Sequence, residues 1–434
     1  MTRISLPYHL TSQEADIPSR NIRAILSPAG HSATPPTMES QRQCVRDALD
    51  HPISSPTLET LATGKRTATV ITSDHTRPVP SHITLPLLLE RLRKGNPEID
   101  IRILVATGCH RPTSPREMRS KFGEAVVEHE NFIIHDCTDR TSLRHMGRLP
   151  SGGELWLNKN ALDTDLLIAE GFIEPHFFAG FSGGRKSVLP GIAGRETVLA
   201  NHCSAFISNP HSRAGSLDQN PIHRDMLFAA QQARLAFILN VTLHPDKSIR
   251  SAFAGHPELA HYEGCRHMRE VVTVPRVQAE IVITSNGGYP LDQNLYQAVK
   301  GMTAAEACCK EGGTIIMVAG CSDGHGGEHF YRALAESASP HALLNSVLNV
   351  PQDKTPPDQW EYQILARILS RHRVILVTDM WEAQHVRALH METASTLSEA
   401  VAMARLAAGP DAQCVVIPDG VSVIVETAPS SAKK

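Results

Sequence analysis

The chain has 434 residues, of which 20% are charged, and its formal net charge is −3. A chain of this length exceeds what one hydrophobic core usually supports, so we expect about two or three domains. The near balance of positive and negative charge provides no basic field for nucleic acid and no cationic face for a membrane surface. We therefore expect neither nucleic acid nor a membrane among the partners.

The amino-terminal residues and the cysteines indicate a cytoplasmic protein. Residues 1–7 contain no apolar segment of the kind found in secretory signals. No run approaches the roughly 18 apolar residues that span a bilayer. The 9 cysteines form no C-x-x-C pair, and an odd number of scattered cysteines fits reduced thiols better than a disulfide framework.

Alternating strand and helix patterns predict an α/β fold. Apolar, β-rich runs occur at residues 67–72, 99–106, 132–135, 165–169 and 235–243. Helical patterns lie between them, as at residues 85–94 and 115–127, which is typical of parallel sheets. A second series covers residues 279–284, 313–319, 373–378 and 413–418. This series predicts a second α/β unit, or a second unit plus a last strand that returns to the first.

The domain boundary is predicted where Pro275 and its neighbours interrupt the helical pattern of residues 257–271. We predict an N-terminal α/β domain over residues 1–274, completed by residues 410–426, and a C-terminal α/β domain over residues 278–408. Residues 427–434 are small and polar, which predicts a flexible tail. Both sheets should be largely parallel, with the active-site cleft between the domains.

Reactive side chains follow the predicted strands. The run at residues 67–72 leads into Asp74, His75, Thr76 and Arg77, and the run at residues 99–106 leads to His110. His176 follows the run at residues 165–169 in the same way. Side chains at the carboxyl ends of strands in one parallel sheet converge on one crevice, so a functional role is favoured for His110 and His176. The guanidinium of Arg77 suits a carboxylate or a phosphate.

A glycine-rich loop at residues 174–187 contains His176 and Lys186. It is not a P-loop, because Arg185 stands where the second glycine would be and Pro190 would end a following helix after about one turn. The backbone of the Ser182-Gly183-Gly184 turn, beside the cations Arg185 and Lys186, still suits a phosphate or another anion.

Candidates outside this loop are ambiguous by themselves. His202 alone is a weak candidate for a metal ligand, because a site made only of protein groups needs three or more ligands. Gln297 and Lys300 lie three residues apart and share a helix face beside Tyr296. That face is either a solvated surface or part of a cleft. Residues 323–328 are interpreted as a structural loop.

Residues 73–80, 107–112, 171–202 and 287–306 together resemble the nickel-dependent lactate racemase family, and the similarity extends from residue 6 to residue 425. The resemblance implies a nickel pincer nucleotide, a pyridinium-3-thioamide-5-thiocarboxylate mononucleotide covalently linked to Lys186. His202 would complete the nickel coordination, since the cofactor supplies three of the four donor atoms. Asp74, His75, Thr76 and Arg77 match the family's cofactor-contacting segment, and Ser182, Gly183 and Gly184 would meet the nucleotide phosphate.

The reaction implied by this resemblance is the interconversion of L- and D-lactate by hydride transfer to and from the cofactor, through pyruvate. A hydride route avoids the dianion that loss of the α-proton would create, which a histidine of pKa near 6.5 is poorly matched to produce. The family's two bases correspond to His110 and His176, and its substrate-binding residues to Arg77, Gln297 and Lys300. Tyr296 and Trp360 would form the pocket wall, and cofactor-biosynthesis proteins would load the enzyme.

Other functions remain open at this point. The same cofactor could serve a racemase or epimerase of another 2-hydroxy acid. Lys186 beside a glycine-rich turn could instead be the Schiff-base lysine of a pyridoxal phosphate racemase. A histidine-rich chain could also be a nickel-binding protein without catalytic activity.

Overall fold

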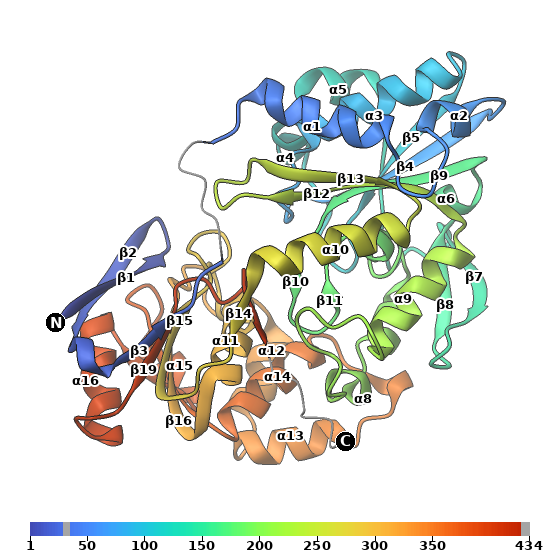
Figure 1. Ribbon diagram of the computed structural model, residues 1–434. Coiled ribbons are helices and arrows are strands. Elements are labelled where there is room, and N and C mark those ends of the chain that lie inside the picture. Colours follow the sequence, from blue (N-terminus) through green and yellow to red (C-terminus); the bar gives the residue numbers. More distant parts are fainter. Residues whose placement is uncertain (29–34, 427–434) are drawn as a thin grey trace, which may run out of the picture. The chain divides into compact units, whose positions relative to one another are not determined.

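The computed structural model describes residues 1–28 and 35–426, and the chain divides into two compact units (Figure 1). The first unit comprises His31–Asn201 and His211–Glu270. The second unit comprises Met1–Gly30, His202–Pro210 and Val271–Lys434. The predicted tail at residues 427–434 lies outside the described residues.

The first unit is built on a six-stranded sheet in the order β13-β12-β9-β4-β5-β6. All neighbours are parallel except β12 and β13, which are antiparallel. The strands are β4 (Thr67–Ser73), β5 (Asp100–Ala106), β6 (Asn131–Ile134), β9 (Leu166–Phe172), β12 (Leu235–Leu243) and β13 (Ile249–Gly255). Both faces of the inner strands are buried, which explains why they read as continuous apolar runs in the sequence.

Helices cover the sheet of the first unit, with α1 and α3 on one side of the strands and α10 on the other in Figure 1. The helices are α1 (Met38–Asp50), α2 (Leu58–Ala62), α3 (Ser81–Gly95), α4 (Pro115–Phe122), α5 (Glu124–His129), α6 (Lys159–Leu162), α7 (Arg195–Asn201), α9 (Pro221–Gln232) and α10 (Leu259–Val272). The helix predicted at residues 115–127 is divided in two, because Gly123 adopts a φ of 87° between α4 and α5. Smaller strands are β7 (Leu143–Arg148), β8 (Glu154–Asn158), β10 (Pro175–His176) and β11 (Gly180–Phe181).

The second unit contains a six-stranded, all-parallel sheet in the order β18-β17-β16-β15-β19-β3. Its strands are β3 (Ile22–Ile25), β15 (Ala279–Ser285), β16 (Cys309–Val318), β17 (Arg373–Val377), β18 (Glu392–Ala394) and β19 (Cys414–Ile417). Its helices are α8 (Ser204–Ile207), α11 (Leu295–Cys308), α12 (Glu328–Ala335), α13 (Pro340–Leu348), α14 (Gln359–Leu369), α15 (Ala383–Ala388) and α16 (Leu397–Ala408). The remaining strands are β1 (Thr2–Tyr8), β2 (Thr11–Ile17), β14 (Thr273–Pro275) and β20 (Ile424–Glu426).

The α/β class with largely parallel sheets is confirmed, but the division of the chain differs from the predicted one. The amino-terminal hairpin of β1 and β2 packs Leu6 and Ile17 into the core formed with Ile283 and Ile316, so it belongs to the second unit. Strand β19 pairs with β15 and β3, so residues 410–426 do not complete the first sheet. These pairings join segments hundreds of residues apart, which local patterns do not reveal.

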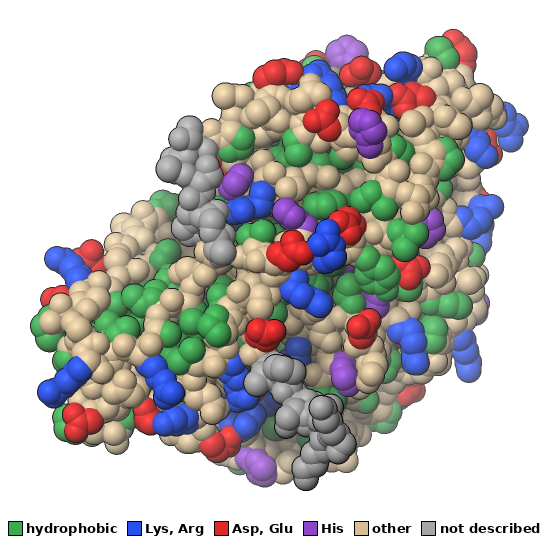
Figure 2. Space-filling model, in the orientation of Figure 1, with side chains coloured by type: hydrophobic (Ala, Val, Ile, Leu, Met, Phe, Trp, Pro, Cys, Tyr) green, Lys and Arg blue, Asp and Glu red, His purple; other side chains and the backbone are tan. Residues whose placement is uncertain are grey.

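Two general properties of the described residues bear on possible partners. No helix within residues 1–28 and 35–426 is long and apolar enough to cross a membrane. On the face drawn in Figure 2, Lys and Arg side chains are interspersed with Asp and Glu side chains.

Candidate active site

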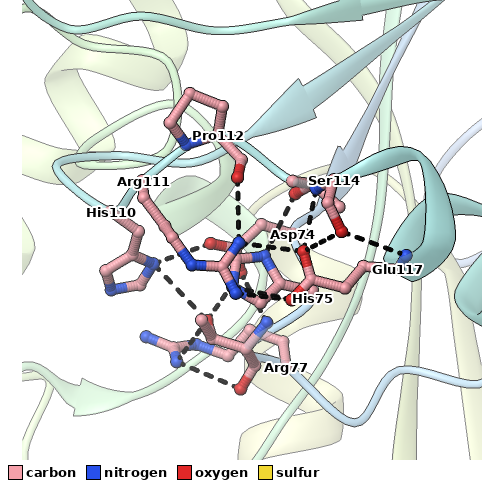
Figure 3. A network of polar contacts seen from close by, with 10 residues as sticks. Asp74, His75, Arg77, His110, Arg111, Pro112, Ser114 and Glu117 are labelled. Carbon is pink, nitrogen blue, oxygen red and sulfur yellow. Dashed lines mark hydrogen bonds and ion pairs between the residues drawn. The ribbon is translucent and has the colours of Figure 1, made fainter.

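Asp74 and His110 meet at the carboxyl ends of two neighbouring strands. In the register of β4 and β5, Ser73 lies opposite Ala106, so the loops after both strands begin side by side. The Asp74 Oδ2 atom accepts a hydrogen bond of 2.7 Å from His110 Nδ1. Its Oδ1 atom accepts from the Thr76 amide at 3.1 Å and from the Thr76 hydroxyl at 2.6 Å. Figure 3 shows this cluster, in which His110 is 44% exposed and Asp74 only 2%.

The surroundings of Asp74 determine the charge of its carboxyl group. Burial alone would raise the pKa of Asp74, but hydrogen bonding and charge from His110, the Arg77 charge and the Thr76 hydroxyl outweigh it and lower the pKa to about 2. Asp74 is therefore a carboxylate at neutral pH. It accepts the Nδ1 proton of His110, which leaves Nε2 as the atom that can exchange a proton with a substrate.

Replacing Asp74 with asparagine should lower both catalysis and stability. Loss of the carboxylate removes the partner that sets the His110 tautomer, so we expect kcat to fall about 10²-fold to 10⁴-fold. Because the folded pKa of Asp74 lies below the usual value of about 3.9, its contribution of about 2 kcal/mol is present above about pH 4 and is lost as the pH falls toward about 2. Urea unfolding measures the free energy of unfolding of wild type and Asp74→Asn. The difference between the two proteins should be smaller at pH 3 than at pH 6.

The matched control is Asp136→Asn, because Asp136 accepts the same pair of hydrogen bonds from Thr138 but is exposed. This variant should keep its kcat. An Asp74→Asn variant with wild-type kcat would show that the carboxylate does not control His110.

Lys121 and Glu170 support the segment that carries Arg77, and sequence reasoning missed both. The half-buried Lys121 side chain donates to the Arg77 carbonyl at 2.8 Å, and desolvation lowers its pKa to about 8. Glu170, in the middle of β9, accepts from Thr72 and Thr84. An acidic residue inside a fully buried strand was the available signal, since such a group is retained only with partners. The Arg77 guanidinium itself lies 3.0 Å from the Thr76 hydroxyl.

His75 contacts the loop and helix that follow β5. Its Nδ1 atom lies 3.2 Å from the Thr113 hydroxyl, and its Nε2 atom lies 3.7 Å from Glu117 Oε1. Glu117 also binds Arg111 and completes the capping box of α4 with Ser114 (Figure 3). Burial lowers the pKa of His75. Both ring nitrogens thus have protein neighbours, and the cofactor contact expected for His75 remains a prediction.

His176 and Lys186 are brought together by the glycine-rich loop. Strands β10 and β11 pair His176 with Gly180, and a short 3-10 helix at Gly184–Ser187 returns the chain. The Lys186 Nζ atom lies 3.5 Å from His176 Nε2. The Ala179 amide donates to His176 Nδ1 at 3.3 Å. The two histidines therefore have Nδ1 partners of opposite character, a carboxylate acceptor for His110 and an amide donor for His176.

The turn at Ser182, Gly183 and Gly184 is packed tightly inside the first unit. The Ser182 amide donates to the Glu174 carbonyl at 2.9 Å, and the Gly184 amide donates to Asn240 Oδ1 at 2.7 Å. Gly184 has a φ of 53°, and a Cβ atom there would lie 2.7 Å from the His261 ring. Two of the three amides expected to bind phosphate thus have protein acceptors, and the phosphate contact of this turn remains a prediction.

Gln297 and Lys300 stand on α11 of the second unit, where the structure confirms that they share a face. The Lys300 Nζ atom donates to Gln297 Oε1 at 2.5 Å. Asn286, which sequence reasoning missed, follows β15 and holds the helix from both sides of Lys300 by donating to the Gln297 carbonyl at 2.6 Å and accepting from the Gly301 amide at 3.1 Å. Burial raises the pKa of the neighbouring Glu361 to about 8, and the Lys300 charge opposes that shift.

His202, Tyr296 and Trp360 form a contiguous aromatic group in the second unit. The Trp360 indole donates to the Tyr296 hydroxyl at 2.8 Å. The His202 ring is 5.1 Å from the Trp360 ring in an edge-to-face arrangement, and His202 is 5% exposed. Among the residues that the structure describes, no three His, Cys, Asp or Glu side chains gather closely enough to hold a metal ion. A nickel ion on His202 would therefore need donors from a cofactor.

Histidine and arginine side chains that follow the carboxyl ends of parallel strands are an arrangement typical of ligand sites in α/β proteins. Residues 8–215 match the family described as lactate racemase N-terminal domain, and residues 274–425 match lactate racemase C-terminal domain. A lactate racemase of Thermoanaerobacterium thermosaccharolyticum is 54% identical over 98% of this chain and 99% of its own. One from Lactiplantibacillus plantarum is 52% identical, over 98% of this chain and 100% of its own.

Solved structures agree with these matches. The lactate racemase apoprotein of T. thermosaccharolyticum superposes with a TM-score of 0.94 at 53% identity, covering 98% of this chain and all 100% of its own. A Thermotoga maritima protein at 18% identity, with a TM-score of 0.64 over 92% of this chain and 100% of its own, shows the fold alone. The chain is an isomerase of the racemase type. It belongs to the lactate racemase family.

Proposed function

We propose that this chain interconverts L- and D-lactate with a covalently bound nickel pincer nucleotide. The observation that carries the proposal is the loop in which the Lys186 amine lies 3.5 Å from His176, in the unit that also holds the Asp74–His110 pair. Relatives named lactate racemase at 52% and 54% identity over nearly the whole chain support lactate as the substrate.

The donor chemistry of the chain fits this cofactor. Lys186 offers the amine for the thioamide link, and His202 offers an imidazole, a ligand suited to nickel. Asp74, His75, Thr76 and Arg77 would contact the nucleotide, and Ser182, Gly183 and Gly184 would hold the loop beneath it. When bound, the nucleotide would supply a reversible hydride acceptor, a capability that no protein side chain has.

The chain's own residues would bind the substrate and move its hydroxyl proton. Arg77 would hold the lactate carboxylate through its guanidinium. His110 would take the hydroxyl proton at Nε2 while Asp74 stabilises the resulting imidazolium. His176 would serve as the base for the other enantiomer, because inversion at the α-carbon places the hydroxyl on the opposite side. The 2-oxo acid formed in between is pyruvate.

Gln297 and Lys300 would bind the oxygens of the substrate, and Tyr296 and Trp360 would form an apolar wall. The 2.5 Å contact between the Lys300 ammonium and Gln297 Oε1 orients both groups on one face. A lysine ammonium is a hydrogen-bond donor suited to an anionic ligand.

Replacing Lys300 with alanine should lower kcat/KM strongly while the nickel content stays unchanged. Loss of one charge-assisted contact costs about 2 to 4 kcal/mol in the transition state, or about 30-fold to 1000-fold in kcat/KM. The control is Lys354→Ala, whose side chain is 75% exposed. Steady-state rates with each enantiomer give kcat/KM, and metal analysis gives the nickel content. Efficiency within about twofold of wild type would remove Lys300 from the site.

The function itself is tested with protein produced together with the cofactor-biosynthesis proteins. L-lactate carrying deuterium at the α-carbon should give D-lactate that retains the deuterium, because a hydride route does not exchange that atom with water. Chiral chromatography with mass detection measures the amount of D-lactate formed and the fraction of it that carries deuterium. Loss of the deuterium to water would overturn the hydride route. If fully loaded protein racemises 2-hydroxybutyrate but not lactate, the assignment of lactate as the substrate is wrong.

A further inference from the structure

Arg185, next to the cofactor-linked lysine of the proposed function, is a buried cation with an unusual set of partners. Its side chain is 2% exposed. The guanidinium donates to the carbonyls of Ala179 at 2.7 Å and Phe181 at 2.8 Å, and it lies 3.2 Å from the Gly183 carbonyl. The sequence suggested that Arg185 would face an anion, and the structure shows instead that protein acceptors surround the guanidinium.

The buried His223 completes this set of acceptors. The Arg185 Nε–H donates to His223 Nδ1 at 2.9 Å. His261 Nε2 lies 3.0 Å from Arg185 Nη1, but it donates to the Ser182 carbonyl at 2.8 Å, so it is a neighbour of the guanidinium and not an acceptor. Burial and the Arg185 charge lower the pKa of His223 to about 3 and also lower that of His261. Both rings are therefore neutral. Burial also raises the pKa of the adjacent Cys265 to about 12, so its thiol carries no charge either.

The four hydrogen bonds of Arg185, three to carbonyls and one to His223, connect one loop to one helix. The three carbonyls lie along the loop that begins with His176 and ends at the 3-10 helix Gly184–Ser187. One guanidinium therefore forms hydrogen bonds to the loop at three points. His223 lies on α9, so its hydrogen bond connects the guanidinium to that helix, and His261 on α10 lies beside the guanidinium and donates to the Ser182 carbonyl of the same loop. Only the planar fork of arginine can donate in so many directions, and a lysine cannot reproduce it.

We propose that Arg185 is the positioning residue for Lys186, holding the loop so that the lysine amine is presented beside His176 for covalent attachment of the cofactor. This inference rests on the proposed function for the identity of the attached group. The positioning of the amine can be measured without it.

The test compares Arg185→Lys with wild type, and His223→Leu with His223→Asn. Arg185→Lys keeps the positive charge but loses the planar guanidinium and its five N–H donors. Asparagine places an oxygen where His223 Nδ1 accepts, whereas leucine removes the acceptor at similar size. We expect the fraction of chains carrying the cofactor mass to fall about 10-fold or more in Arg185→Lys and His223→Leu, and to be restored in His223→Asn. Arg234→Lys is the control, since Arg234 donates to the Leu162 carbonyl at 3.1 Å, outside the loop.

A second measurement uses the protein without cofactor. Pyridoxal 5′-phosphate followed by borohydride labels accessible amines, and peptide mass analysis gives the labelling rate of Lys186 alone. This rate should change at least about threefold in the two disruptive variants and remain at the wild-type value in His223→Asn, and circular dichroism should be unchanged in all four variants.

The outcomes separate the two proposals. Wild-type loading and wild-type Lys186 labelling in Arg185→Lys and His223→Leu would overturn the role of Arg185. Absence of any covalent mass on loaded wild-type protein would overturn the cofactor attachment instead, and the labelling rates would still decide the positioning. If Arg185→Lys does not fold, the pair of His223 variants decides alone.

Discussion

Replacing Lys186 with alanine should abolish covalent cofactor attachment and reduce racemisation below detection. Alanine has no amine to form the thioamide, and the backbone of the loop stays fastened by Arg185 and by the Gly184 amide, which donates to Asn240 at 2.7 Å. The fold should therefore survive. Intact mass after denaturation reports the attachment, and metal analysis and chiral assays report nickel and activity.

Two further variants make the Lys186 experiment specific. Lys186→Arg keeps a positive charge near His176 but cannot form the link, so it should behave as the alanine variant does. Lys94→Ala removes a lysine that is 68% exposed, and it should load and turn over normally. A full cofactor mass on denatured Lys186→Ala protein would assign the attachment to another residue.

The strand ends of the candidate site were predictable because they depend on local patterns. The apolar runs at residues 67–72 and 99–106 became β4 and β5, and their side-by-side loops hold Asp74 and His110 at one edge of the sheet, a specific contact that the sequence analysis did not name. The i, i+3 spacing of Gln297 and Lys300 placed both on one face of α11. In the helix, the period of a single element determines which side chains meet.

Partners from distant segments could not be predicted in this way. Nothing near Arg185 in the sequence indicates that His223 would accept from it or that His261 would lie beside it, because α9 and α10 approach the loop only in the folded chain. The pairing of β3 with β19 is equally non-local, and it moved the first residues of the chain into the second unit. Family resemblance supplied the roles of Lys186 and His202, which no pattern of residues by itself implies.

Replacing either His110 or His176 with alanine should abolish net racemisation, yet each variant should retain single-turnover oxidation of one enantiomer. The hydroxyls of the two enantiomers face opposite sides, so each needs its own base, and loss of a general base costs about 10²-fold to 10⁴-fold. His129→Ala is the control, because His129 lies at the end of α5 and its Nδ1 donates to the Ala125 carbonyl of the same helix at 2.8 Å. Rapid quench with L- or D-lactate, followed by measurement of pyruvate, gives the half-reactions.

The structure further predicts that the two variants differ in their coupling to Asp74. His110 is bound to that carboxylate at 2.7 Å, whereas His176 accepts from the Ala179 amide at 3.3 Å. Asp74→Asn should therefore impair the same half-reaction as His110→Ala, and combining the two substitutions should add little, since residues that act as a unit are not additive. The half-reaction that depends on His176 should respond to Asp74→Asn far less. Equal losses of both half-reactions in both histidine variants, with cofactor still bound, would refute a division of labour between the two bases.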